Sequence, residues 1–125
     1  MIRAALAALL LALPLSAVAD PYDTAIGQVA AAIQIARACP GFALIGAGGE
    51  QGFVPAATEL LKADGLKPNR FKKFWFYGQT GWIEQMKTEA LTARGINGAN
   101  RPALCALGRR VAGTGDPIGR FLVRK

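Results

Sequence analysis

The side chains best suited to binding chemistry lie in one basic and aromatic stretch. Residues 70–77 read Arg-Phe-Lys-Lys-Phe-Trp-Phe-Tyr, so five aromatic rings and three cations occupy eight positions. Rings at head-group depth and cations on lipid phosphates would make this stretch an interfacial anchor. The alternative is an ordinary amphipathic helix that buries one aromatic side. We take Arg70, Lys72, Lys73 and Trp75 as candidate binding residues.

Two further cations, Arg109 and Arg110, are neighbours near the end of the chain. They either join the first group in one positive surface or form a solvated helix face. The whole chain carries a net charge of +7 at pH 7. For an exported protein the anionic partners are a membrane surface, a cell-wall polymer or an acidic protein. Nucleic acid is not expected as a partner.

Several kinds of catalysis lack the residues that they need. The chain has no His, and its single Ser, Ser16, lies in the N-terminal segment. Ser-His-Asp and Cys-His arrangements are therefore excluded. A zinc site would have to rely on carboxylates alone, which is rare. We expect no metal site, no cofactor and no enzymatic activity.

One hydrolytic alternative remains, a carboxylate pair acting on cell-wall material. Glu84 and Glu89 are five positions apart, as are Glu59 and Asp64, so each pair is divided between different sides of a helix. Glu50, beside several glycines, is the acid best placed for a concave site. A pocket that holds it near a second carboxylate would favour this alternative.

The glycines around Glu50 resemble a phosphate-binding loop only at first sight. After Gly46 and Gly48, a dinucleotide fingerprint needs glycine at the position of Gln51. No second strand–helix unit follows within so short a chain. We expect residues 46–52 to form a flexible turn, or an interruption of a helix, and to be the most mobile internal segment.

The first residues have the pattern of a secretory signal peptide. Arg3 is followed by an unbroken apolar run, and residues 16–19 read Ser-Ala-Val-Ala, which suits cleavage after Ala19. A membrane anchor is the alternative, although the run is short for a span of about 20 residues. We expect residues 1–19 to be removed and residues 20–125 to form one exported domain, periplasmic or secreted.

Export has a consequence for the two cysteines, Cys39 and Cys105. In an oxidising compartment two cysteines usually pair. We therefore expect a Cys39–Cys105 disulfide that joins the first helix to the penultimate one. Two free thiols are the alternative.

The periodicity predicts an all-α domain, a small bundle of about five short helices held by this disulfide. Apolar residues recur at helical spacing in most segments, with cap residues between them. No strand alternation is evident. The expected helices cover residues 20–39, 54–64, 69–77, 80–94 and 100–112, with a short final helix after Asp116.

The end of the chain resembles a known family. Residues 105–109 read Cys-Ala-Leu-Gly-Arg and residues 118–122 read Ile-Gly-Arg-Phe-Leu. This order is similar to the closing motif of a family of small exported alphaproteobacterial proteins of unknown function. In that family an earlier Cys ends the first helix, as Cys39 does here, and an Ala-Arg-Gly-hydrophobic turn like residues 93–96 precedes the last helices. The resemblance implies a helical fold and the disulfide, and it implies no activity.

These observations favour a non-enzymatic envelope module that contacts an anionic surface or an acidic partner. The cell-wall hydrolase is the alternative function.

Overall fold

A computed structural model describes residues 20–71 and 81–125 of the chain. The predicted signal segment and most of the basic and aromatic stretch, including Lys72, Lys73 and Trp75, lie outside the described residues. The elements follow one another along the chain in this order: α2 (Pro21–Ala38), β1 (Phe42–Leu44), α3 (Glu50–Ala63), the 3₁₀ turn η2 (Pro68–Phe71), α5 (Gly81–Thr92), α6 (Arg101–Val111), the 3₁₀ turn η3 (Gly119–Phe121) and β2 (Leu122–Arg124).

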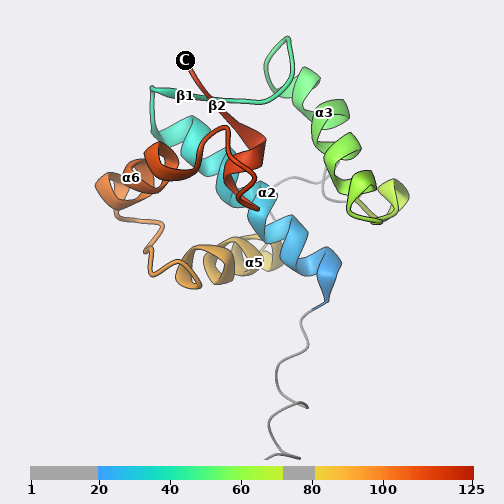
Figure 1. The fold of residues 1–125 in the computed structure, drawn as a ribbon. Coiled ribbons are helices and arrows are strands. Elements are labelled where there is room, and N and C mark those ends of the chain that lie inside the picture. Colours follow the sequence, from blue (N-terminus) through green and yellow to red (C-terminus); the bar gives the residue numbers. More distant parts are fainter. Residues whose placement is uncertain (1–19, 72–80) are drawn as a thin grey trace, which may run out of the picture.

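Helix α2 runs through the middle of the domain, and other elements pack around it (Figure 1). It begins where the sequence predicts, because the Asp20 carboxylate accepts a hydrogen bond of 2.8 Å from the Tyr22 backbone N–H and Pro21 suits the first turn. Its buried residues are mostly small, and they are not confined to one side: Ala25, Ile26, Gly27, Val29, Ala30, Ala31, Ala32 and Ile35. Small side chains on several sides let neighbouring elements approach the helix closely.

Helix α2 approaches α5 very closely at Gly27. A Cβ atom placed on Gly27 would lie only 2.3 Å from the Met86 carbonyl oxygen and 3.4 Å from the Ala90 Cβ. The two helices therefore touch through backbone at this point. Ile83 and Leu91 of α5 are buried on either side of the contact. Glycine is required at position 27 because no side chain fits there. The backbone conformation is helical, so the conformational freedom of glycine is not the reason.

Helix α6 crosses the C-terminal end of α2 and is joined to it covalently. The predicted disulfide between Cys39 and Cys105 is present, with Cα atoms 5.6 Å apart. Gly108 allows the close contact one turn later, because a Cβ there would lie 3.0 Å from Ile35 and 3.0 Å from the Phe42 ring. Asn100 caps α6 as expected, accepting a hydrogen bond from the Ala103 backbone N–H.

The expectation of a strand-free fold is wrong. The domain is mostly helical, with four α-helices in the described residues, but β1 and β2 pair antiparallel with Phe42 opposite Arg124 and Leu44 opposite Leu122. Each strand has three residues, too few to show alternation in the sequence. The partners lie at distant places in the chain, so no hairpin turn signals the pairing.

The short helix expected after Asp116 is a single 3₁₀ turn. Asp116 does accept hydrogen bonds from the backbone N–H groups of Ile118 and Gly119, at 2.8 and 3.0 Å, as a cap would. The chain then becomes extended at Leu122, where φ is −118° and ψ is 145°. Leu122 is fully buried beside Phe121, so pairing with β1 replaces the helix.

Residues 46–49 form a turn packed against the first turn of α3. The backbone at Gly46, Gly48 and Gly49 has positive φ, which only glycine adopts easily. A Cβ on Gly52 would lie 1.6 Å from the Ala47 carbonyl oxygen, so the turn and the helix touch through backbone. Helix α3 begins at Glu50, earlier than the sequence predicts, and Pro55 lies inside it. The turn is therefore held closely; its mobility stays a prediction.

Two ion pairs connect the C-terminal residues to the helices. Arg94, in the turn after α5, lies 2.8 Å from the Asp116 carboxylate, and Arg120 lies 2.7 Å from Asp64 at the end of α3. Burial raises the pKa of Asp116, but hydrogen bonds from Arg94 and from two backbone N–H groups outweigh it. The pKa of Asp116 therefore lies below its ordinary value of 3.8.

The Gly27 contact predicts that Gly27→Ala destabilises the domain. Alanine favours the helix by about 1 kcal/mol, but the clash with the α5 backbone costs about 1–3 kcal/mol or more. We expect a lower melting temperature in thermal unfolding followed by circular dichroism. Gly115→Ala is the matched control, because a Cβ there meets nothing within 4 Å. Equal melting temperatures for wild type and Gly27→Ala would contradict the close crossing.

The disulfide predicts a large loss of stability in the Cys39→Ala, Cys105→Ala double variant. Its cysteines are separated by 66 residues, for which loop entropy gives about 4 kcal/mol. Urea unfolding of the variant and of the oxidised wild type measures the difference. Reaction of the unreduced native protein with a thiol reagent would show that the bond is absent.

The Asp116 pKa predicts a specific pH dependence. A carboxyl group whose pKa is lowered in the folded state stabilises the fold above its unfolded pKa, and this stabilisation is lost as the pH falls through the lower, folded pKa. Melting temperature should therefore drop below pH 3.8, and less steeply in Asp116→Asn. Glu59→Gln is the control, because its pair with Lys62 is exposed. Identical slopes for wild type and Asp116→Asn would refute the assignment.

Candidate functional site

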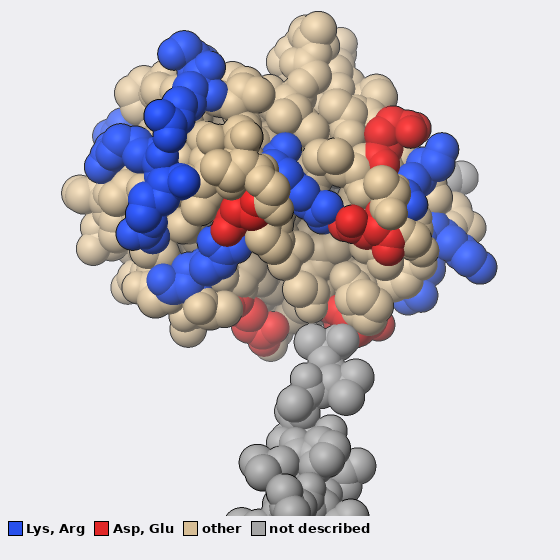
Figure 2. Space-filling model, in the orientation of Figure 1, with Lys and Arg blue, Asp and Glu red and all other residues tan. Residues whose placement is uncertain are grey.

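Cations gather at the end of the domain where the disulfide lies. We call Arg101, Arg109, Arg124 and Lys125 the cationic face. Figure 2 shows Lys and Arg side chains in a band on the side of α6 and the C-terminus, with an acidic group against the inner edge of its lower part. Three of the four line a shallow hollow of about 460 Å³, whose other lining residues are Cys39, Pro40, Gly41, Phe42 and Cys105.

Backbone carbonyls at two helix ends fix two of these cations. The Arg124 guanidinium donates a hydrogen bond to the Arg109 carbonyl oxygen, in the last turn of α6. The Arg101 Nε donates to the Ala38 carbonyl oxygen, the last residue of α2, at 2.8 Å. Carbonyls at a helix C-terminus lack partners within the helix, so cationic donors are favourable there. The pairing of β1 with β2 brings Arg124 to this position.

The hollow is positively charged and its floor is apolar. None of its lining residues is acidic. Within the described residues, the ion pairs involve Lys62, Lys87, Arg94 and Arg120, and none involves the cationic face. Val123, the neighbour of Arg124 in β2, is 40% exposed, but it does not line the hollow, because successive side chains of a strand point to opposite faces. An anionic partner with some apolar surface would meet complementary chemistry here.

The structure separates the binding residues that the sequence suggests. Arg109 belongs to the cationic face. Arg110 is exposed beside it but lies about 100° further around α6. Lys72, Lys73 and Trp75 lie outside the described residues.

Arg70 lies at the other end of α2. Its guanidinium stacks on the Tyr22 ring, 3.8 Å from the ring centroid, and the Tyr22 hydroxyl accepts a hydrogen bond from the Lys67 backbone N–H. Tyr22 is in the first turn of α2, whereas Arg109 lies by Cys39 just beyond its end. A helix of 18 residues is about 27 Å long. Arg70 and Arg109 therefore do not form one compact surface.

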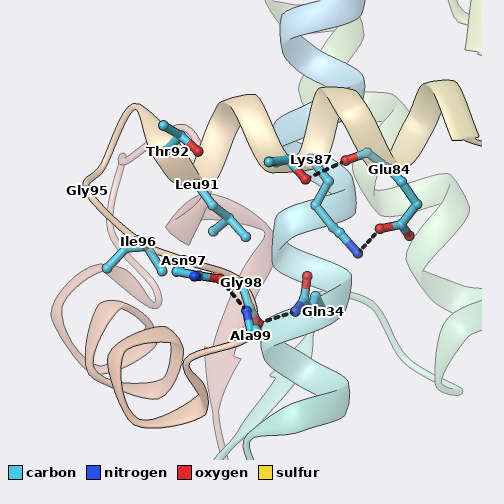
Figure 3. A pocket seen from close by; sticks show the side chains of 11 residues that line it. Gln34, Glu84, Lys87, Leu91, Thr92, Gly95, Ile96, Asn97, Gly98 and Ala99 are labelled. Carbon is cyan, nitrogen blue, oxygen red and sulfur yellow. Dashed lines mark hydrogen bonds and ion pairs between the residues drawn. The ribbon is translucent and has the colours of Figure 1, made fainter.

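A polar cavity of about 690 Å³ lies between α5, the turn after it and α2 (Figure 3). The Gln34 side-chain nitrogen donates to the Gly98 carbonyl oxygen at 2.9 Å, which ties α2 to this turn. Lys87 lies 2.7 Å from the Glu84 carboxylate, and its side chain is only 14% exposed. Leu91 and Ile96 supply the apolar part of the wall.

The carboxylates considered for hydrolysis are mostly engaged with cations. Glu59, Asp64 and Glu84 each form an ion pair. Glu89 lines a separate hollow of about 390 Å³ together with Asp20 and Asp23. No group of three or more potential metal ligands occurs within residues 20–71 and 81–125. Over the same ranges, no helix has both the length and the apolar composition to cross a membrane.

Sequence reasoning missed Arg101, Arg124 and Lys125 as neighbours of Arg109. A signal did exist, since two of them follow the apolar residues Phe121–Val123 at the end of the chain. Arg124 and Lys125 reach α6 through the pairing of β1 with β2, which joins distant parts of the chain, whereas Arg101 lies at the start of α6 itself. Gln34 and Lys87 were likewise not singled out.

No family model, no curated protein and no solved structure matches the chain. The resemblance of its closing motif to small exported proteins therefore stays a prediction. Its function must be argued from its own side chains.

Proposed function

We propose that this chain is an exported, non-enzymatic module that binds an anionic membrane surface through the cationic face. The observation that carries the proposal is the gathering of Arg101, Arg109, Arg124 and Lys125 around a hollow without an acidic residue. The disulfide supports an oxidising compartment, and the leader-like residues 1–19 support export.

The shape of the face favours a surface over a small ligand. Three of the cations line an open hollow, and the Lys and Arg side chains on this side are spread along a band and do not converge on one point (Figure 2). A small anion would be held by several donors at once in an enclosed site.

The expected affinity is modest. Each Lys or Arg near an anionic leaflet contributes about 1 kcal/mol. Four such residues give about 4 kcal/mol, which corresponds to a dissociation constant of about 1 mM. Useful binding therefore needs a high density of anionic lipid.

Co-sedimentation with vesicles tests the proposal. The residue 20–125 protein should bind vesicles that contain phosphatidylglycerol at low salt and should ignore phosphatidylcholine vesicles. Binding should weaken strongly in 1 M salt, where the Debye length is about 3 Å. Arg109→Glu plus Arg124→Glu should abolish it, because the local charge is reversed.

The matched control reverses the same charge elsewhere. Lys62→Glu plus Lys67→Glu changes the net charge equally, on the far side of the domain near α3. Its binding should stay close to that of the wild type. Equal loss in both double variants would show that only net charge matters, and no binding by the wild type at low salt would refute the membrane proposal. Retention on an immobilised acidic protein would then identify the other kind of partner.

A further inference from the structure

Gln34, in the wall of the polar cavity, has a buried acceptor without a donor. The hydrogen bond from the Gln34 nitrogen to the Gly98 carbonyl fixes the orientation of the amide. The Gln34 oxygen is then buried and accepts no hydrogen bond. Buried polar atoms normally have a partner, so this oxygen calls for an N–H or O–H donor.

The wall of the same cavity also carries a donor group. In Figure 3 the Lys87 side chain extends from α5 toward the space above Gln34. Its ammonium has three N–H groups, and its ion pair with Glu84 engages one side of it. Gln34 and Lys87 also line a second hollow of about 400 Å³ with Ile33, Arg37 and Ala38. The two side chains therefore lie where the two spaces meet.

An acceptor beside a donor is complementary to a secondary amide. The amide N–H would donate to the Gln34 oxygen, and its carbonyl oxygen would accept from the Lys87 ammonium. Leu91 and Ile96 supply apolar wall for a methyl group next to the amide. The opposite charges of Lys87 and Glu84 compensate each other, which favours a neutral ligand.

We propose that this cavity binds a secondary amide carried by a small neutral ligand, either an N-acetylated sugar or a short peptide. The proposal does not depend on the cationic face or on membrane binding. Because the Gln34 oxygen has almost no exposed surface, the ligand must displace the groups that cover it. Lys87 is suited to this movement, because its four-carbon stem is flexible.

Nuclear magnetic resonance titration of the residue 20–125 protein tests this proposal. Three probes are compared: a β-1,4-linked trimer of N-acetylglucosamine, the β-1,4-linked trimer of glucose that lacks the acetamido groups, and N-acetylalanine N-methylamide. At least one amide probe should shift the Gln34 side-chain and Gly98 backbone signals at millimolar concentration. If only one does so, it identifies the source of the amide.

Two lysine variants provide a matched comparison. Lys87→Met should weaken binding of the active probe at least about tenfold, because the charged donor is lost. Lys62→Met removes a lysine with the same spacing to its glutamate on α3 and should bind like the wild type. The proposal is overturned if neither amide probe shifts these signals, if the glucose trimer shifts them equally, or if both variants bind alike.

Discussion

The rest of the domain depends on the close contact of other elements with α2. That helix carries small residues on several sides, and at Gly27 the backbone of α5 touches it directly. Burial of apolar surface stabilises a fold by about 25 cal/mol for each Å². Small residues bury little area each, so their own contribution to this term is small. They stabilise the domain by letting other elements come close to α2, so that the larger side chains of α5, α6 and η3 can pack around this helix. A domain of this size gains a continuous core by that means.

The second constraint is the covalent link between α2 and α6. The disulfide and Gly108 hold α6 against Ile35 and Phe42, and β1 follows α2 directly. Strand β2 then pairs with β1 and returns the end of the chain to α6, where Arg124 reaches the Arg109 carbonyl. The cationic face is therefore a product of tertiary contacts between three parts of the sequence. Residues that lie far apart in the chain become neighbours because they all pack near the C-terminal end of α2.

The extent of successful prediction follows from the range of each interaction. Caps act within three residues, so Asp20 and Asn100 could be identified from sequence as helix starts, and both are confirmed. The cysteine pair was also predicted correctly, because the chain offers only one pairing. The strands could not be found, since a three-residue strand has no periodicity and Phe42–Leu44 pairs with residues almost at the end of the chain.

The distinction between local and long-range interactions also applies to the candidate site. Arg109 was recognised as a candidate because it is next to another arginine in the sequence. Arg101 and Arg124 could be recognised only from the structure, which shows their hydrogen bonds to the carbonyl oxygens of Ala38 and Arg109. Arg70 shows the opposite error. It lies next to other cations in sequence, but the structure places it against Tyr22, about one α2 length from Arg109.

Some of the cations at the disulfide end stabilise helix C-termini. The positive charge left for a partner is the total charge of these cations minus the charge that the helix ends offset. The C-termini of α2 and α6 both meet there, as the bonds from Arg101 to Ala38 and from Arg124 to Arg109 indicate. Each helix end carries about half a negative charge, so the two ends together offset about one cation. The four cations of the cationic face, with exposed Arg110 beside them, exceed this several-fold. Helix-end stabilisation therefore accounts for the positions of two guanidinium groups but not for the total charge. Folding does not require the excess charge to lie at one end. Under the function proposed above, a positive potential on one side of the domain would orient it toward an anionic surface.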